Sequence, residues 1–265
     1  MGEIQGNTDK WFFKINPSFK FLIIDALFIV YLVVSNLNTM IWAACLFLIL
    51  YLAVNGFSAR LSFWLIILTL WVSVFSSTAM IFFGQGTHVL FRWYLVVISE
   101  ESLARGTLIG LRTFIFSLLG LIMASTSRPV PFFYSLMQQL RVPVKYAYGC
   151  LAAFRMLPMM AEEFVHIRQA MKVRGLRQKG IKAMYERIKR YALAMLAQSI
   201  RRAQRTAVAM EAKRFSMTES RTYYYEIGWS RMDLLFSGVI VAVVIGGFLL
   251  SGWFPLTPYT HVIDH

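Results

Sequence analysis

The chain has 265 residues, of which 58% are hydrophobic, with a mean hydropathy of +0.58 and a formal net charge of +14. This composition, gathered in long apolar runs, excludes a soluble globular domain and a disordered chain and favours an integral membrane protein. The two cysteines belong to different environments, Cys45 in an apolar run and Cys150 in a basic stretch, so we expect no disulfide.

The charge is concentrated in one part of the chain. Residues 126–232 contain 20 Lys or Arg and 6 Asp or Glu, whereas the rest of the chain contains 7 of each. Basic residues close to the ends of spans favour the cytoplasmic side of the membrane. We therefore predict three parts: N-terminal transmembrane helices at 1–125, a basic cytoplasmic segment at 126–232, and a last transmembrane helix with a tail at 233–265.

Five apolar runs predict membrane-spanning helices. In chain order they cover residues 21–35, 40–54, 61–83, 106–125 and 233–254. The first two are short and close together, as in a tight transmembrane hairpin. The mixed stretch 88–103 predicts an interfacial or re-entrant helix, which would be a sixth span if it crosses the membrane. With five spans, the N-terminus is expected inside and the C-terminus outside.

Small and charged residues inside the spans predict how the helices pack. Arg112 lies within the fourth span, where an ionisable side chain is expected to face protein or to reach toward the membrane surface. The spacing Gly106-x-x-x-Gly110 permits close contact with another helix. In the last span small residues recur every four positions, at Gly238, Ala242 and Gly246, and they predict a second close contact.

The basic segment predicts two long helices after a short one at 132–140. The first long helix should run from Val142-Pro143 to Arg174, with Gly175 at its C-cap. Pro158 predicts a kink within this helix, because proline lacks a backbone donor and clashes with the preceding turn. The second long helix should run over 181–214, and we expect the two helices to cross.

The second long helix has two distinct faces. The apolar face contains Ala192, Leu196, Ser199, Ala203, Ala207 and Met210. Arg187, Arg190, Arg201, Arg202 and Arg205 lie near the opposite face. Because alanine permits close approach, the apolar face is expected to pack on another helix.

Each long helix ends in cations. Lys172 and Arg174 end the first, and Lys213 and Arg214 end the second. The helix dipole favours cations at such ends by ~0.3–1 kcal/mol, which is a purely structural explanation. The functional alternative is that the helix ends dock into acidic pockets of a partner.

Signals of catalysis are weak. The chain contains no G-x-x-x-x-G-K-[ST] motif, so we expect no P-loop and no ATP or Mg²⁺ bound by this chain. Glu163-x-x-His166 has the spacing of a metal-binding helix pair but lacks a second copy, and we expect these side chains to be solvated or ion-paired. The sequence thus predicts a chain that is not an enzyme and binds no metal.

Four motifs resemble those of the T-component, the transmembrane coupling subunit of energy-coupling factor (ECF) ABC transporters. They are Asn16-Pro17-Ser18-Phe19-Lys20, Ser125-Thr126-Ser127-Arg128-Pro129, Phe154-Arg155-Met156-Leu157-Pro158 followed by Ala170-Met171-Lys172-Val173-Arg174-Gly175, and Ala209-Met210-Glu211-Ala212-Lys213-Arg214-Phe215. Val173 stands where the family usually has alanine. Ungapped alignment places Lys213 at the family's arginine and Arg214 at its glycine, although Arg214 would take the arginine role after a shift of one position.

The resemblance implies a fold and a mechanism. The fold is all-α, with about five or six transmembrane helices and long cytoplasmic coupling helices crossing beneath the membrane part, in the inner or plasma membrane. Two ABC-type ATPase subunits, which bind ATP and Mg²⁺, would hold the two helix ends. One would bind Val173, Arg174 and Gly175, and the other would bind Ala212 with Lys213 or Arg214. Their closure would move a separate substrate-binding membrane subunit, the S-component, for uptake of a vitamin, a related micronutrient or a metal ion.

Two other functions stay open on the residues alone. A membrane-anchored protein could bind nucleic acid or the ribosome through residues 126–232, but the ordered helix around Pro158 and the charges at helix ends favour the coupling subunit, with no nucleic acid bound. A channel or permease would need polar residues at corresponding midspan positions, and Asp25 and Arg112 are weak support for one.

Overall fold

The computed structural model describes residues 15–84, 89–93, 96–173, 180–214, 223 and 227–257. The chain divides into two compact units. The first, here called the bundle, is made of residues 1–132 and 227–265. The second, here called the coupling segment, is made of residues 133–226. Each unit is described by itself.

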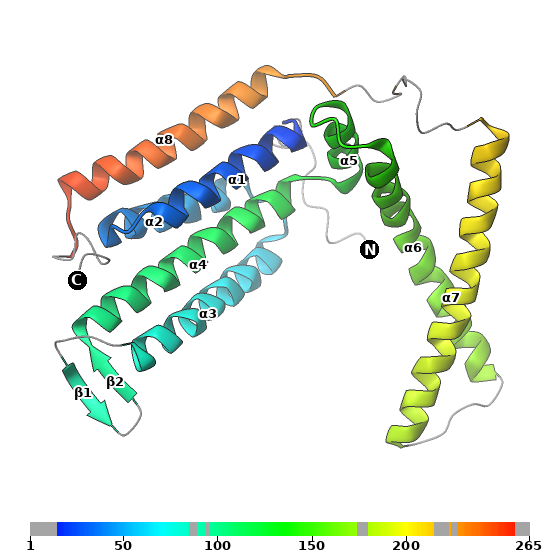
Figure 1. Cartoon of the computed structure of the whole chain (residues 1–265), viewed down its shortest axis with the longest axis horizontal. Helices are drawn as coiled ribbons and strands as arrows, with labels where there is room; N and C mark the ends of the chain where they lie inside the picture. Colours follow the sequence, from blue (N-terminus) through cyan, green and yellow to red (C-terminus); the bar gives the residue numbers. More distant parts are fainter. Residues whose placement is uncertain are drawn as a thin grey trace. The chain divides into compact units, whose positions relative to one another are not determined.

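Five helices form the bundle (Figure 1). They are α1 (Pro17–Val33), α2 (Leu37–Val54), α3 (Ala59–Phe83), α4 (Glu100–Thr126) and α8 (Arg231–Trp253). Within the described residues, α2, α3, α4 and α8 are long and apolar enough to cross a membrane. The shorter α1 packs against α4 and α8. The five predicted apolar runs therefore each become a helix of an all-α membrane protein.

Polar residues occupy the N-cap positions of several of these helices. The Asn16 side chain accepts a hydrogen bond from the Ser18 backbone and precedes Pro17 at the first helical position of α1. Asn36 caps α2 in the same way. Ser230 and Asp233 form a reciprocal capping box at the start of α8. The helix boundaries thus follow from local sequence, with caps where the apolar runs begin.

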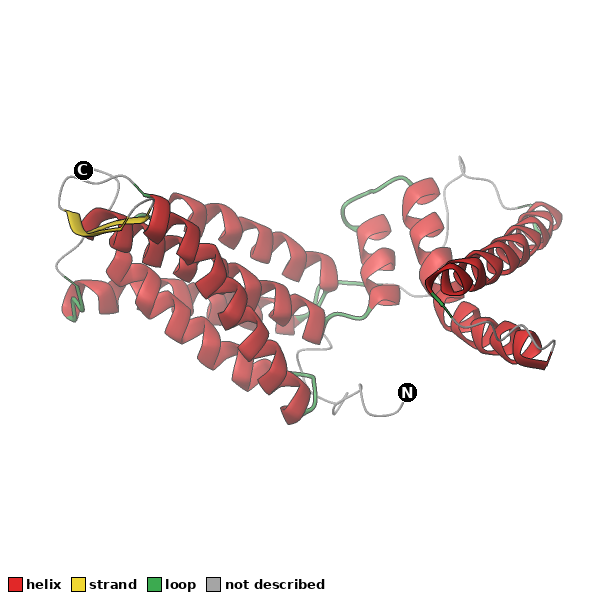
Figure 2. Cartoon of the chain, turned by 90° about the horizontal axis from the view of Figure 1, so that it is seen from below, coloured by secondary structure: helices red, strands yellow, loops and turns green. Residues whose placement is uncertain are grey.

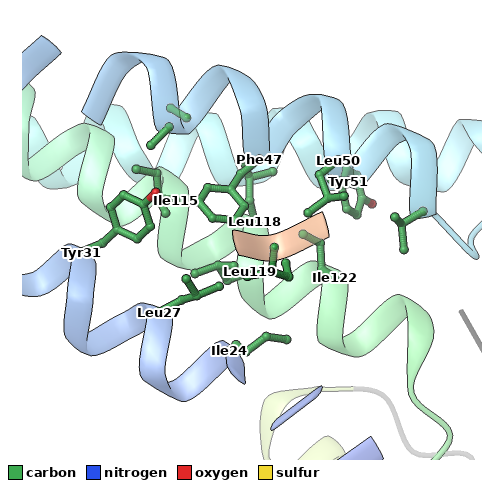
Figure 3. Packing of buried hydrophobic residues seen from close by; sticks show 14 of the residues in the cluster. Ile24, Leu27, Tyr31, Phe47, Leu50, Tyr51, Ile115, Leu118, Leu119 and Ile122 are labelled. Carbon is green, nitrogen blue, oxygen red and sulfur yellow. The ribbon is translucent and has the colours of Figure 1, made fainter. Parts of the chain in front are cut away.

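The core of the bundle lies where α1 and α2 meet α4 (Figure 3). Tyr31 of α1 and Phe47 of α2 are fully buried and make an edge-to-face contact, with ring centroids 5.5 Å apart. Ile115, Leu118 and Leu119 of α4 are buried beside them. The outward faces of the helices carry large exposed apolar side chains, as expected of surfaces that contact lipid.

The predicted close contact at Gly106 and Gly110 is confirmed, between α4 and α3. Ser77 Oγ donates to the Gly106 carbonyl at 2.7 Å, and Ser73 Oγ donates to the Gly110 carbonyl at 2.6 Å. A Cβ atom added at Gly106 would collide with Ile81. Glycine at these positions lets the two backbones approach closely enough for the serine hydroxyls to join them.

The prediction of a helix at 88–103 is wrong. The chain there forms a two-stranded antiparallel hairpin, β1 (Val89–Trp93) and β2 (Val96–Ser99), at one end of the bundle (Figure 2). Valine, isoleucine and aromatic residues dominate this stretch, and they favour strands over helix. Ser99 then caps α4, which begins at Glu100, six residues before the predicted span.

The last span packs through only part of the predicted small-residue stripe. Gly238 and Ala242 of α8 are exposed, whereas Gly246 is partly buried, with its ideal Cβ position 3.6 Å from the Leu46 side chain of α2. The buried positions of α8 are Asp233, Phe236, Ile240, Gly247 and Ser251. Gly247 lies against the Ala43 backbone of α2 at 3.7 Å from its ideal Cβ position. The four-residue spacing of small residues therefore did not predict the buried face of α8, because large apolar residues, Phe236 and Ile240, are also buried there.

The coupling segment contains the two predicted long helices, α6 (Val144–Val173) and α7 (Ile181–Ala212), which cross as predicted (Figure 1). The short helix α5 (Pro129–Gln138) precedes them, and its Phe133 ring lies 5.4 Å from the Phe154 ring of α6. Pro158 lies inside α6, which continues on both sides of it. The kink at Pro158 stays a prediction.

Candidate functional site

The first candidate docking end is the C-terminal end of α6. The helix ends at Val173, whose side chain is 88% exposed, and Lys172 is exposed beside it. Arg174 and Gly175, the other residues predicted for this end, lie outside the described residues. An apolar side chain so exposed at a helix end is available to a partner.

The second candidate docking end, at the C-terminus of α7, is described through Arg214. Ala212, Lys213 and Arg214 are all exposed. The Lys213 backbone N–H still bonds back to the Ala209 carbonyl at 3.2 Å, so Lys213 is the C-cap of the helix. Arg214 follows with a φ of +53°, in the left-handed region. The residue that follows a helix in this conformation is usually glycine.

The crossing of α6 and α7 is held by one ion pair and one aromatic pair. Arg202 Nη2 of α7 donates to Glu163 Oε2 of α6 at 3.2 Å, with both side chains partly buried. Phe164 and Tyr191 meet edge to face, with ring centroids 5.7 Å apart. Glu163 is thus ion-paired, as predicted. Among the described residues no group of three or more His, Cys, Asp or Glu side chains could hold a metal ion.

The face of α7 that meets α6 is not the predicted one. The alanine-rich face was expected to pack on another helix, but Leu196 is 58% exposed, and Ala192, Ala203 and Ala207 are exposed too. Ser199 and Met210 of the same face are partly buried. Arg202, predicted on the polar face, instead faces α6. The ion pair with Glu163 explains the choice, because one face of α7 offers a cation where α6 presents a carboxylate.

The exposed apolar face of α7 forms a continuous stripe, here called the outer stripe. Its members recur every three or four residues: Tyr185, Ile188, Ala192, Leu196, Ile200, Ala203 and Ala207. Residues at this spacing lie on one side of a helix. An apolar stripe of six turns without cover in the coupling segment marks a surface for a partner.

A polar cluster joins the helix ends through which the coupling segment leaves and re-enters the bundle. Lys20 of α1 is 1% exposed, and its Nζ donates to the backbone carbonyl of Thr126, the last residue of α4, at 3.1 Å. Asp233, near the start of α8, accepts hydrogen bonds from the backbone N–H groups of Asn16 and Ser230, both at 2.8 Å. The motifs at 16–20 and 125–129 therefore meet in space.

Sequence reasoning singled out these two motifs but missed the contact between them. The signal available was Lys20 itself, a cation at the edge of an apolar run, with Asp233 at the edge of another. Spacing along the chain does not show that residues 20, 126 and 233 lie together. Arg112 was expected to face protein or to reach toward the membrane surface. It faces protein, because its Nη2 donates to the Val34 carbonyl at the end of α1 at 3.0 Å.

Comparison with known proteins places this architecture in a family. A family model described as CbiQ, cobalt transport protein, matches residues 8–224. The energy-coupling factor transporter transmembrane protein EcfT of Limosilactobacillus fermentum is 30% identical over 186 residues, which cover 66% of this chain and 69% of that protein. The EcfT of Thermotoga maritima is 24% identical over 255 residues, covering 91% and 92% of the two chains.

The family match and the structure agree on the same parts of the chain. The matched residues contain the first four bundle helices, all but the last two residues of the coupling segment, and both candidate docking ends. The apolar helices make the protein a multi-pass membrane protein. The chain therefore belongs to the CbiQ family and is a T-component, the transmembrane component of an energy-coupling factor transporter.

Proposed function

We propose that this chain couples two ATPase subunits to a separate substrate-binding membrane subunit, the S-component, of one importer. The observation that carries the proposal is the pair of long crossed helices whose exposed ends bear basic motifs, in a chain that belongs to this family. Closure of the ATPases on ATP would move the two ends, and the crossing at Glu163 and Arg202 would carry that movement along both helices.

The first ATPase would dock at Val173, Arg174 and Gly175. Val173 is exposed at the very end of α6, so the next residues continue from a helix end that is open to a partner. An arginine here offers a planar fork of donors for a carboxylate. ATP and Mg²⁺ would be bound by the ATPases, and this chain would be a subunit without catalysis of its own.

The second ATPase would dock at the end of α7, through Lys213. The left-handed backbone of Arg214 supports the ungapped alignment, in which Arg214 occupies the family's glycine position and Lys213 the arginine position. Lys213, as the C-cap, has an exposed side chain directly beside Ala212. Lysine keeps the positive charge but lacks the bidentate geometry of arginine, so this contact should be the weaker of the two.

The S-component would pack on the outer stripe of α7. The stripe is apolar and exposed, and a membrane protein presents apolar faces that suit it. The substrate, a vitamin, a related micronutrient or a metal ion, would be bound by that subunit. In the inner or plasma membrane, the N-terminus and residues 126–232 would lie in the cytoplasm and the C-terminus outside, because the basic residues gather in that segment. No observation favours the alternative of nucleic-acid or ribosome binding.

The test is co-purification of the ATPases with the full-length chain from membranes. Arg174→Glu should lower the amount of one ATPase retained by about tenfold or more, since a docking cation is replaced by an anion. Arg174→Glu combined with Lys213→Glu should release both. Thermal unfolding of each detergent-purified variant should match the wild type, since the substituted residues lie outside the bundle. Retention of both ATPases by the double variant would contradict the proposed function.

A further inference from the structure

A cleft between α6 and α7 carries cations that have no ion pair among the described residues of the two helices. The cleft has a volume of about 430 Å³ and lies between the C-terminal part of α6 and the N-terminal part of α7. Arg168 and Lys172 line it from α6, and Arg187 and Arg190 line it from α7. Glu186 is the one acidic side chain of its lining. We call it the basic cleft.

The charges of the basic cleft contrast with those at the helix crossing. There, Arg202 is held by Glu163 at 3.2 Å. Within the described part of α6 and α7, that is the sole ion pair, and the four cations of the cleft have none. Residues 167–190 contain nine Lys or Arg and one Asp or Glu. Cations gathered at one place repel one another, so an anionic partner would stabilise this arrangement.

Aromatic and apolar side chains also line the cleft. Phe164 and Tyr191 line it with their rings in edge-to-face contact, and Met171 and Ile188 are also in its lining. A cavity of this size accepts a few side chains, as in sites for peptides or small ligands.

We propose that the basic cleft is a second docking site for the ATPase subunit held at the end of α6, and that it receives an acidic surface segment of that subunit. This inference rests on the proposed function. Lys172 lines the cleft and is followed directly by the docking residues Val173, Arg174 and Gly175, so a subunit bound at the helix end reaches the cleft without a break. The helix end supplies one point contact, and the cleft adds orientation, because it engages α6 and α7 together.

The proposal predicts that this interaction depends on salt. Four cations facing carboxylates at a partly exposed interface are screened by ions, so the ATPase should dissociate at a lower salt concentration once the cleft charges are reversed. The matched control lies on the same helix. Arg201 and Arg205 line a separate cavity, and reversing them changes the net charge by the same amount.

The experiment compares three variants of the full-length chain co-expressed with its ATPases. Arg187→Glu with Arg190→Glu is expected to lower the retained ATPase by about tenfold near 0.15 M ionic strength. Arg201→Glu with Arg205→Glu should behave as the wild type. The neutral change Arg187→Gln with Arg190→Gln should give an intermediate loss, which a folding defect from reversed charges would not produce.

The outcomes separate this inference from the proposed function. Should both double reversals lower retention equally, the effect is that of net charge and the cleft has no special role. Should the cleft reversal leave retention unchanged while Arg174→Glu releases the ATPase, the cleft proposal is wrong and the proposed function stands. Retention of the ATPase by both the cleft reversal and Arg174→Glu would contradict the cleft proposal and the proposed function together. A photoreactive side chain at Ile188 that cross-links to an ATPase subunit would support the cleft as a direct contact.

Discussion

At the scale of the residue, Arg214 shows how a backbone conformation identifies a role that the side chain does not. It lies directly after α7 with a φ of +53°, where a residue with a Cβ atom is less stable than glycine by roughly 1–2 kcal/mol. Two cations stand side by side, and sequence alone left open which of them meets a partner. The conformation places Arg214 at the left-handed position that follows the C-cap Lys213 and leaves Lys213 as the expected contact.

This assignment predicts opposite effects for two neighbouring substitutions. Arg214→Gly should keep the second ATPase bound and relieve the strained backbone, raising helix stability by up to ~1 kcal/mol. Lys213→Ala should weaken retention of that ATPase several-fold, because its charge is removed from the docking end. Co-purification measures both effects, and Lys213→Arg serves as the control that should retain or improve binding. The reverse pattern would assign the contact to Arg214.

At the scale of the element, the contact between α3 and α4 depends on the absence of side chains. A Cβ at Gly106 would collide with Ile81 and lie 3.2 Å from the Ser77 carbonyl, whereas a Cβ at Gly120 of the same helix would meet nothing within 4 Å. The serine hydroxyls that bond the glycine carbonyls also need this close approach. Gly106 and Gly120 thus differ in environment although both lie within α4.

The element-scale prediction compares these two glycines. Gly106→Ala should destabilise the bundle by about 1–3 kcal/mol through overpacking. Gly120→Ala should leave stability unchanged or raise it by up to ~1 kcal/mol, because alanine is the better helix former. Thermal unfolding of the detergent-purified chain measures both changes. An equal effect of the two substitutions would show that helix propensity, and not close packing, decides the outcome.

At the scale of the whole molecule, the coupling segment carries surfaces of different chemistry. The helix ends and the basic cleft are cationic, and the outer stripe of α7 is apolar. Apart from Ile188, which belongs to both the outer stripe and the lining of the basic cleft, these surfaces use separate residues, so damage to one should leave the other intact. That separation fits the proposed function, in which the chain would hold soluble ATPases and a membrane subunit at once.

The whole-molecule prediction is a separation of the two kinds of partner. Leu196→Glu with Ile200→Glu places two charges in the outer stripe and should release the S-component, since a buried unpaired charge is costly, while both ATPases stay bound. Co-purification followed by mass spectrometry measures all partners in one experiment. The conservative pair Leu196→Met with Ile200→Val keeps the stripe apolar and should retain every partner. Loss of the ATPases together with the S-component would contradict the claim that the two kinds of partner bind separate surfaces.

Much of the fold followed from local sequence. Each apolar run became a helix, the asparagine and serine caps marked helix starts, and the two long basic helices have nearly the predicted bounds. The stretch at 88–103 failed because its mixed composition gave no clear period, and its β-branched and aromatic residues paired as a hairpin. The sequence located the proposed docking residues at the two helix ends, but it did not show the backbone conformation of each of them.

By itself, the sequence determined the membrane class, the helices and the concentration of charge in one segment, because these depend on composition and on local periodicity. Only the tertiary structure decided which faces are used. It paired Arg202 with Glu163 and left the alanine face open, brought Lys20 to the end of α4, and gathered the four cations of the basic cleft. The physical reason is that pairing and burial depend on residues far apart in the chain, and their separation along the sequence does not show how close they lie in space.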